Sequence, residues 1–410
     1  MWHNSKRKFV WIIPLLGITV WLYAYTHVNG KTDKRSIEKH DIPYVEHVEE
    51  YKDNYVYCFG SQDKVDYGSS DGMNKTSDLL PTPVIVITYQ RSGSTFVGNI
   101  LRLNGDVFYF FEPLHFLKSG YKKLHFLDLQ KRSFDTYLTA AQFVIRKAIT
   151  CKFQHLPLEF WKETFYDDAI QGYQLMSFYR RFKSEFNRRY SDPSMFKKVL
   201  VNLENTCKSS KTVIIKTIRT PLFLMKDLLS SLKNVKIIHL IRDPRPTISS
   251  QNFFGSFVFK STADHAYNLC ARVYNDVITF DILSFYHPKN LIRIMYESLA
   301  KNPLKISKDL YAFINITFSN TVANSLQLMT SSNISHKKLL FIKKGANSTH
   351  LQSRWRLNET VKFVMYVDSQ CYALYQKLGY IPVSSEDMLR NLSIPLFVQN
   401  TSVLAVKLLP

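Results

Sequence analysis

The stretch from Pro83 to Pro113 constrains the fold of this chain more than any other part of its sequence. It begins with an apolar, β-branched run from Val84 to Thr88, which predicts a buried strand. A polar loop of small residues follows, and apolar residues then recur at helical spacing from Phe96 to Leu103. A strand that leads through such a loop into a helix presents free backbone N–H groups and the helix dipole to an anion. The stretch therefore predicts a phosphate-binding loop.

The loop differs from the P-loop of ATP-binding proteins. Aligned on Gly93 and Thr95, the chain has Thr88 where a Walker A motif has its first glycine, and Ser94 where that motif has its lysine. Arg91 instead places a fixed positive charge inside the loop. The anion predicted here is therefore not the triphosphate of ATP.

Further strands alternate with helices along the chain. Helical spacing is present at Leu222 to Leu232 and at Pro303 to Ile314. This alternation implies right-handed crossovers and a parallel sheet covered by helices on both faces. Between Phe116 and Phe196 we expect several helices rich in aromatic and basic residues, which form either an acceptor-binding wall or ordinary solvated helices. The additional predicted strands are Val107 to Phe111, Lys211 to Thr217, Val235 to Ile241 and Leu291 to Tyr296.

A second cluster of polar residues follows the strand that ends at Ile241. Arg242 comes at the carboxyl end of this strand, where open α/β sheets bind ligands. Two prolines stiffen the turn, and Thr247, Ser249 and Ser250 are expected to open the next helix. Arginine binds phosphate bidentately, so a second phosphate site is one interpretation. The other is that Arg242 and Asp243 form a local ion pair that caps a helix. Together with the first loop, the cluster favours a nucleotide with phosphates at two separate positions.

The N-terminal segment predicts a membrane anchor. A basic run, Lys6 to Lys8, precedes an uncharged and mostly apolar run from Phe9 to Tyr25. A cleaved signal peptide is the competing reading, but no small-x-small cleavage site follows. The basic side of an uncleaved anchor stays in the cytosol, so the rest of the chain is expected in the lumen. The predicted divisions are a cytosolic tail at 1–8, a transmembrane signal anchor at 9–25, a luminal stem at 26–80 and a catalytic domain at 81–410.

Charge, cysteines and glycosylation sequons agree with a luminal protein. The net charge of +21 predicts an anionic partner. Five cysteines allow two disulfides in an oxidising compartment, with pairing that the sequence does not reveal. Neither a CxxC pair nor histidine at zinc-ligand spacing is present, so no metal site is expected. Seven N-x-S/T sequons follow the predicted anchor, at Asn74, Asn315, Asn333, Asn347, Asn358, Asn391 and Asn400.

Several short motifs resemble those of sulfotransferases that use 3′-phosphoadenosine 5′-phosphosulfate (PAPS). They are YQRSGSTF after a strand, then FEP, IKTIR and HLIRDPRPTISS. The chain is most similar to the Golgi family of galactose, N-acetylgalactosamine and N-acetylglucosamine 6-O-sulfotransferases, over roughly Pro83 to Tyr380. This resemblance implies a P-loop-kinase-like α/β fold, in which a parallel sheet is flanked by helices. It also implies a Golgi membrane protein of type II, preceded by its N-terminal transmembrane helix, with a luminal catalytic domain.

The resemblance also assigns donor-binding residues. The first loop would hold the 5′-phosphosulfate, and Arg242 and Ser250, eight residues apart as in the family, would hold the 3′-phosphate. The segment from Lys343 to Arg356 resembles the loop that folds over the nucleotide in this family. The predicted PAPS-binding residues are Arg91, Ser92, Gly93, Ser94, Thr95, Phe96, Arg242, Ser249, Ser250, Trp355 and Arg356.

Three residues are predicted to carry the chemistry. Glu112 follows a strand between aromatic residues and Pro113, so we expect a raised pKa and a role as the base that accepts the proton of the acceptor hydroxyl. A helix-capping or salt-bridged glutamate is the alternative. Lys216 and Arg91 would stabilise charge on the bridging oxygen of the donor, while a core lysine that reaches towards solvent is the alternative for Lys216.

The predicted reaction transfers a sulfuryl group from PAPS to a sugar hydroxyl of a glycan or proteoglycan, at the 6-position of galactose, N-acetylgalactosamine or N-acetylglucosamine. A tyrosylprotein sulfotransferase and a non-enzymatic, membrane-anchored binder of sulfated glycans are the alternatives. A kinase or a glycosyltransferase is disfavoured because the loop lysine and any DxD motif are absent. Nucleic acid is not an expected partner. A homodimer is compatible with the chain, but the sequence does not fix the oligomeric state.

Overall fold

The structure is a computed structural model that describes residues 81–128, 130–162, 193–254, 261–330 and 352–398. All of these residues belong to one compact unit. No helix within these ranges is long and apolar enough to cross a membrane. The predicted cytosolic tail, anchor and stem, at 1–80, lie outside the described residues.

A parallel sheet of five strands forms the centre of this unit. Its order is β2-β5-β1-β6-β7, and all four pairings are parallel. Because β1 pairs with β5 on one side and β6 on the other, the loops after β1 and β6 lie at neighbouring strand ends. From β1 the chain first fills one side of the sheet, with β2 at the edge and then β5 beside β1, and afterwards the other side, with β6 and β7. Such a change of side is a switch point, where α/β sheets bind ligands. The predicted parallel sheet is confirmed, with strands β1 (Thr82–Ile87), β2 (Val107–Phe111), β5 (Thr212–Thr217), β6 (Lys236–Ile241) and β7 (Leu291–Met295).

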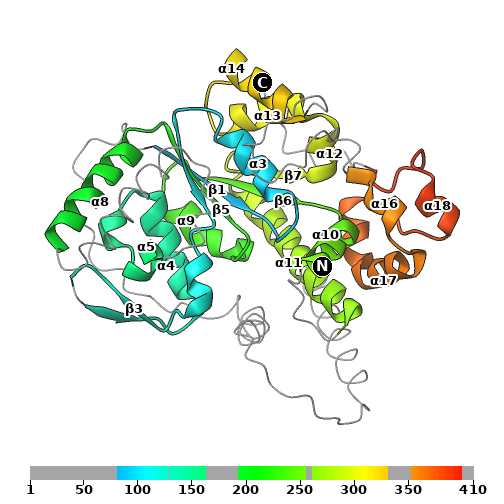
Figure 1. Cartoon of the computed structure of the whole chain (residues 1–410), viewed down its shortest axis with the longest axis horizontal. Helices are drawn as coiled ribbons and strands as arrows, with labels where there is room; N and C mark the ends of the chain where they lie inside the picture. Colours follow the sequence, from blue (N-terminus) through cyan, green and yellow to red (C-terminus); the bar gives the residue numbers. More distant parts are fainter. Residues whose placement is uncertain (1–80, 129, 163–192, 255–260, 331–351, 399–410) are drawn as a thin grey trace, which may run out of the picture. The chain divides into compact units, whose positions relative to one another are not determined.

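Helices cover both faces of the sheet (Figure 1), and successive residues of each strand point to opposite faces, so both faces have side chains to bury. Ile85 and Ile87 of β1 pack into one core cluster, and Val84 and Val86 pack into another. The first cluster includes residues of α4 (Tyr137–Ile149), α5 (Leu158–Lys162), α8 (Pro193–Lys208) and α9 (Met225–Ser231). The second includes residues of α3 (Ser94–Leu101), α12 (Tyr296–Lys301), α13 (Pro303–Phe313) and α14 (Asn320–Thr330).

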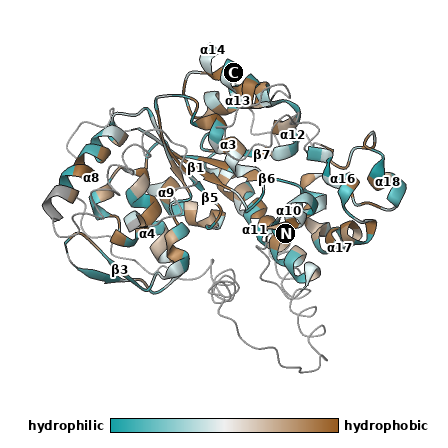
Figure 2. Cartoon of the chain, in the orientation of Figure 1, coloured by the Kyte–Doolittle hydropathy of each residue, from teal (hydrophilic) through white to brown (hydrophobic). Residues whose placement is uncertain are grey.

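Hydropathy follows this layering. Figure 2 shows hydrophobic colours along β1, β5 and β6, and hydrophilic colours along much of the outer surface of the helices. Residues 84–87 of β1 and residues 213–215 of β5 are fully buried. Strands buried on both faces need continuous apolar runs instead of alternation, which is why these runs were recognisable in the sequence.

The region between Phe116 and Phe196 differs in part from the helices expected there, and its residues 163–192 lie outside the described residues. It holds a short antiparallel hairpin, β3 (Lys123–His125) with β4 (Lys131–Ser133), in addition to helices. A capping box at Thr136 and Thr139 then fixes the start of α4. Two short 3₁₀ helices complete the region, η1 (His115–Ser119) and η2 (Phe153–His155), and another, η3 (Leu222–Leu224), precedes α9.

The helix after β6 begins earlier than expected. Helix α10 (Pro244–Phe253) starts at Pro244, three residues before Thr247, and Asp243 caps it by accepting a hydrogen bond from the Arg245 N–H. Proline is favoured in the first turn of a helix because its φ angle is already helical and its missing N–H would have no partner there. The two prolines that were expected to stiffen a turn therefore belong to the helix itself.

The C-terminal part of the described chain packs against the long helix α11 (Thr262–Tyr286). Helix α17 (Val361–Leu378) lies along α11 and ends at Gly379 in the left-handed conformation. Helices α16 (Trp355–Asn358) and α18 (Glu386–Arg390) pack beside each other near α17.

Two disulfides join segments that are distant in sequence. Cys270 on α11 is bonded to Cys371 on α17, and Cys151 is bonded to Cys207 on α8. The prediction of two disulfides is thereby confirmed, and Cys58 lies outside the described residues. All four bonded cysteines are buried, so each bond is part of the core that it crosses.

Replacing both Cys270 and Cys371 by alanine should lower the free energy of unfolding by about 3 kcal/mol, because the bond closes a long loop of the unfolded chain. Thermal unfolding of the variant under oxidising conditions measures this loss, with Cys58→Ala as the matched control. A variant that melts at the wild-type temperature would contradict a structural role for this disulfide.

Candidate functional site

The loop after β1 is held in a conformation that few sequences can adopt. Arg91 has a φ of 64° and Gly93 a φ of 83°, both in the left-handed region. A Cβ atom on Gly93 would lie 2.3 Å from the ring of Tyr296, so only glycine fits without a shift. The Ser92 hydroxyl donates to the Tyr89 carbonyl at 2.6 Å and contacts the Thr88 hydroxyl at 2.5 Å. Ser92 therefore shapes the loop from within.

Helix α3 begins directly at this loop. Gly93 is its N-cap residue, and no side chain of the described chain caps it. Phe96 and Val97 donate their N–H groups to the Gly93 carbonyl, which leaves the N–H groups of Ser94 and Thr95 in the first turn. An uncapped first turn preceded by glycine suits a bound anion, as the sequence predicts. Phe96 packs against the core cluster on the α3 side of the sheet.

Arg242 joins the second predicted phosphate site to this loop. Its Nη1 donates to the Arg91 carbonyl at 2.9 Å, and its guanidinium carbon lies 4.7 Å from the centre of the Tyr296 ring. The Arg91 Nε in turn donates to the Ser250 hydroxyl at 2.9 Å. The structure therefore brings Arg91, Arg242 and Ser250 together at one edge of the sheet. Ser249 instead donates its hydroxyl hydrogen to Glu359.

The positive charges in this cluster lie close to one another. Burial and the neighbouring Arg242 lower the pKa of Arg91, whose guanidinium also stacks 3.9 Å from the centre of the Phe254 ring. The buried Nε of Arg242 has no hydrogen-bond partner among the described residues. Two adjacent cations with an unused donor form a surface that an anion would stabilise.

The alternative interpretation of this motif proposed an ion pair between Asp243 and Arg242, and the structure does not contain that pair. The Asp243 carboxylate binds the Arg245 guanidinium at 2.8 Å and caps helix α10. The capping part of that interpretation is confirmed, and the ion pair with Arg242 is wrong. Arg242 is left without a carboxylate partner in the described part of the chain.

Glu112 lies at the end of β2 with its side chain buried. It binds Lys216 at 2.5 Å between Oε1 and Nζ, and its other oxygen accepts a hydrogen bond from Arg219. Burial favours the neutral carboxyl group, but the charges of Lys216 and Arg219 outweigh burial and lower the pKa to about 2. The expected rise in the pKa of Glu112 is therefore wrong, because two cations fill the surroundings that the sequence suggested were apolar. The salt-bridged alternative describes the geometry seen here.

Lys216 is fully buried on β5, beside Phe111 of β2 in the sheet register. Its Nζ lies 3.9 Å from the centre of the Phe111 ring and binds Glu112. Burial lowers the pKa of Lys216, while Glu112 opposes that effect. A lysine that reaches towards solvent is ruled out by this position, and Lys216 lies in the same ion-pair cluster as the predicted base.

Two predicted donor-binding residues, Trp355 and Arg356, contact other parts of the protein. The Arg356 guanidinium donates to the carbonyls of Met388, Leu389, Asn391 and Ile394 at 2.7–2.9 Å, which occupies four of its five donors. Trp355 is half-buried, and its ring lies 5.1 Å from the Arg245 guanidinium carbon. The Arg356 guanidinium is therefore bound mainly to backbone carbonyls here, and Trp355 packs within the C-terminal segment, residues 352–398. Donor binding by these two residues stays a prediction. Residues 343–351 of the loop expected to cover the nucleotide lie outside the described residues.

Two residues of the site carried no role in the sequence analysis. Arg219 follows Lys216 by three residues within the IKTIR motif, so its place beside the strand end could have been noticed. Tyr296 contacts both the Gly93 position and Arg242, but only the pairing of β7 with β6 brings it there. Local sequence offers no signal for that contact.

The described residues hold no cluster of three or more histidine, cysteine, aspartate or glutamate side chains that could bind a metal ion. The arrangement supplies cations and N–H groups for an anionic ligand at the ends of β1 and β6. It also supplies a carboxylate at the end of the neighbouring β2–β5 pair. All five strand ends lie at the same edge because the sheet is parallel.

Comparison with known proteins agrees with these motifs. Residues 81–362 match the family model described as the sulfotransferase domain. The chain is 26% identical over 352 residues to carbohydrate sulfotransferase 1 of Homo sapiens, an alignment that covers 77% of this chain and 83% of the relative. It is 24% identical over 344 residues to human carbohydrate sulfotransferase 6, covering 76% and 84%.

Among solved structures, the chain is similar to the sulfotransferase domain from the Synechococcus PCC 7002 olefin synthase. The TM-score is 0.39 at 15% identity, and the alignment covers 73% of this chain and 97% of that domain. Mouse sulfotransferase SULT7A1 complexed with PAP aligns with a TM-score of 0.34 at 13% identity, covering 76% and 85%.

The ion pairs of Glu112 predict a pH-dependent contribution to stability. The pKa of Glu112 in the folded protein, about 2, lies below its ordinary value of 4.5, so its ionised form stabilises the fold above pH 4.5. At pH 7, Glu112→Gln should lower the free energy of unfolding by about 3 kcal/mol, because it leaves the buried Lys216 without its partner. The difference from wild type should shrink as the pH falls from 4.5 towards 2.

Chemical denaturation of both proteins between pH 2 and pH 7 measures this difference. A difference that stays constant across the whole range would contradict the lowered pKa of Glu112.

Proposed function

This chain belongs to the sulfotransferase domain family, and we propose that it transfers a sulfuryl group from PAPS to a sugar hydroxyl of a glycan. One observation carries the proposal: Arg242 donates to the Arg91 carbonyl, which joins the two predicted phosphate sites into one continuous surface. A single ligand with two separated anionic groups can contact both. PAPS is such a ligand, because it carries a 5′-phosphosulfate and a 3′-phosphate.

Different residues at the edge of the sheet would bind the two ends of the donor. The first turn of α3 and Arg91 would bind the 5′-phosphosulfate, since free N–H groups and a cation converge there. The Arg242 guanidinium, with its unused Nε, and the Ser250 hydroxyl would bind the 3′-phosphate. Ser92 and Gly93 shape this surface from within the loop.

Glu112 would accept the proton of the acceptor hydroxyl. As the hydroxyl oxygen bonds to sulfur, the bond between sulfur and the 5′-phosphate oxygen breaks and 3′-phosphoadenosine 5′-phosphate (PAP) departs. In a loose transition state the proton becomes acidic as this bond forms, so even a carboxylate with a pKa of about 2 can receive it late in the step. Lys216 and Arg219 hold that carboxylate ionised and add positive charge beside the reacting groups.

Sugar as acceptor is supported by the names of the curated relatives, which are carbohydrate sulfotransferases 1, 2, 5 and 6. We propose the 6-hydroxyl of galactose, N-acetylgalactosamine or N-acetylglucosamine as the acceptor, from the resemblance of the sequence motifs. The positive net charge suits anionic glycans, which makes proteoglycan chains a fitting class of acceptor.

We also propose that the enzyme is a type II Golgi membrane protein with a luminal catalytic domain at 81–410. Two described disulfides support an oxidising compartment. Asn315, Asn358 and Asn391, the sequon asparagines within the described residues, are all exposed and accessible to glycosylation. The proposed anchor at 9–25 and stem at 26–80 rest on the sequence alone.

Arg242→Ala should raise the Michaelis constant for PAPS by about 10- to 100-fold, the effect of losing one charge-assisted hydrogen bond of roughly 1.5–3 kcal/mol. Arg91→Ala should act in the same direction. Sulfuryl transfer from ³⁵S-labelled PAPS to desulfated keratan or chondroitin chains measures both. Lys208→Ala, which removes one exposed cation from α8, controls for the change in net charge. Unchanged PAPS kinetics in Arg242→Ala would refute the assignment of Arg242.

Glu112→Gln should reduce kcat by about 10²- to 10⁴-fold while PAP still binds, because the proton acceptor is lost and the donor surface remains. Turnover is measured at 20 °C on protein shown by circular dichroism to be folded. Glu204→Gln is the matched control, since Glu204 is also a buried carboxylate but binds Gln154 at the start of η2. Near-normal turnover of Glu112→Gln would remove Glu112 as the base.

A further inference from the structure

An acidic residue directly follows the arginine that we assign to the 3′-phosphate. Asp243 is adjacent to Arg242 in sequence, and its side chain is almost fully buried. A free carboxylate there would compete with phosphate for Arg242 and would repel the anion. In the structure, this carboxylate binds Arg245.

The Arg245 side chain binds both oxygens of the Asp243 carboxylate. Its Nε lies 3.0 Å from Oδ1 and 3.2 Å from Oδ2, and its Nη2 lies 2.8 Å from Oδ2. The Arg245 N–H donates to Oδ1 at 2.9 Å as well. Arg245 has no exposed surface, so this is a buried, bidentate ion pair of the kind that arginine forms best.

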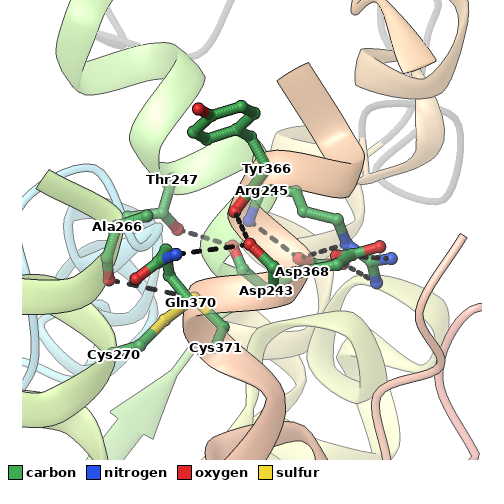
Figure 3. Close-up of a disulfide and its surroundings, with 10 residues drawn as sticks. Asp243, Arg245, Thr247, Ala266, Cys270, Tyr366, Asp368, Gln370 and Cys371 are labelled. Carbon is green, nitrogen blue, oxygen red and sulfur yellow. Dashed lines mark hydrogen bonds and ion pairs between the residues drawn. A yellow bond between two sulfur atoms is a disulfide. The ribbon is translucent and has the colours of Figure 1, made fainter. Parts of the chain in front are cut away.

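The C-terminal segment holds Arg245 in this position. Its Nη1 donates to the Ile381 carbonyl at 2.9 Å and lies 3.5 Å from the carboxylate of Asp368 on α17. The rings of Trp355 and Tyr375 lie 5.1 and 5.2 Å from its guanidinium carbon. Figure 3 shows Asp243, Arg245 and Asp368 gathered near the Cys270–Cys371 disulfide, which ties α17 to α11. Ile381, Asp368 and Tyr375 all follow residue 362, where the match to the family model ends.

A second acid near Arg242 is also engaged elsewhere. Glu297 accepts a hydrogen bond from the Asp243 N–H at 2.9 Å and another from the Tyr380 hydroxyl at 3.1 Å. Burial, and then the charge of Asp243, raise the pKa of Glu297 to about 7, so its negative charge is partly suppressed. Tyr380 again comes from the C-terminal segment. Both acids beside Arg242 are therefore occupied by groups other than Arg242.

We propose that Arg245 is a positioning residue for the 3′-phosphate site: it holds the Asp243 carboxylate away from Arg242 and leaves the Arg242 guanidinium open to the donor. This inference rests on the proposed use of PAPS. It gives the C-terminal segment a part in donor binding without direct contact to the donor.

The test uses Arg245→Lys, which keeps a positive charge but cannot bind both oxygens of Asp243. Its dissociation constant for PAP should rise about tenfold, because the released carboxylate competes for Arg242. Its dissociation constant for adenosine 5′-monophosphate, which lacks the 3′-phosphate, should stay within about twofold of wild type. Adding Asp243→Asn to Arg245→Lys should restore PAP binding, because asparagine still caps α10 but carries no charge. Isothermal titration of the full-length protein measures each constant.

Arg293→Lys is the matched control. Arg293 is another buried arginine that binds an aspartate, Asp281, but it lies on β7 and not on the loop or helix that follows β6. It should lower the melting temperature without changing PAP affinity. Asp243→Asn alone should leave the affinity for PAP within about twofold of wild type, because Arg245 already neutralises the charge of Asp243. A tenfold gain in the PAP affinity of Asp243→Asn would overturn the inference, even if Arg245→Lys fails to fold.

The outcomes separate this inference from the proposed function. If the wild-type protein binds PAP no more tightly than adenosine 5′-monophosphate, the proposed function fails. If wild type discriminates between them but Arg245→Lys discriminates equally well, only the positioning role of Arg245 fails. Loss of affinity for both nucleotides in Arg245→Lys, without rescue by Asp243→Asn, would also overturn it, because that pattern indicates general loss of structure.

Discussion

The donor site that we propose depends on the hydrogen bond from Arg242 to the Arg91 carbonyl. This bond joins the loops after β1 and β6, which the sheet places side by side because these two strands pair directly. Gly93 lets the ring of Tyr296, which follows β7, lie against the first of these loops, since any side chain at residue 93 would collide with that ring. A neutral carbonyl is a suitable partner for Arg242, because it orients the guanidinium without cancelling the charge that an anion needs. The arrangement places two cations close together at the edge of the sheet, and it therefore favours a ligand with two anionic groups.

Each of three carboxylates near these cations is bound by another side chain or N–H group. Glu112 is bound by Lys216 and Arg219, Asp243 by Arg245, and Glu297 by the Asp243 N–H and Tyr380. Each pair is largely buried, where an uncompensated charge would be costly. The result is a division of the site. The β2–β5 end holds the buried ion pairs of Glu112, and the β1–β6 end holds the cations Arg91 and Arg242. The C-terminal segment contacts Arg245, beside the second end, through Ile381 and Asp368.

The sequence predicted the fold well because the relevant signals are local. Apolar β-branched runs such as Val84 to Thr88 appear where strands are buried on both faces, and the glycine-containing loop before α3 has few structural alternatives. Predictions failed where distant contacts decide the outcome. The pKa of Glu112 depends on Lys216 of β5 and on Arg219, which follows that strand. The sequence alone does not reveal that Asp243 binds Arg245, because the position of Arg245 depends on where the C-terminal segment packs. The disulfide pairing likewise follows from helix packing, such as that of α11 with α17.

The most direct test of the account is a crystal structure of the protein bound to PAP. The account predicts that the 3′-phosphate contacts Arg242 and Ser250, and that the 5′-phosphate lies at the first turn of α3 beside Arg91. Glu112 should remain bound to Lys216 or Arg219, facing the position of the transferred group. A nucleotide bound in the reverse orientation, or at a site that leaves Arg242 and the α3 terminus without phosphate, would contradict it.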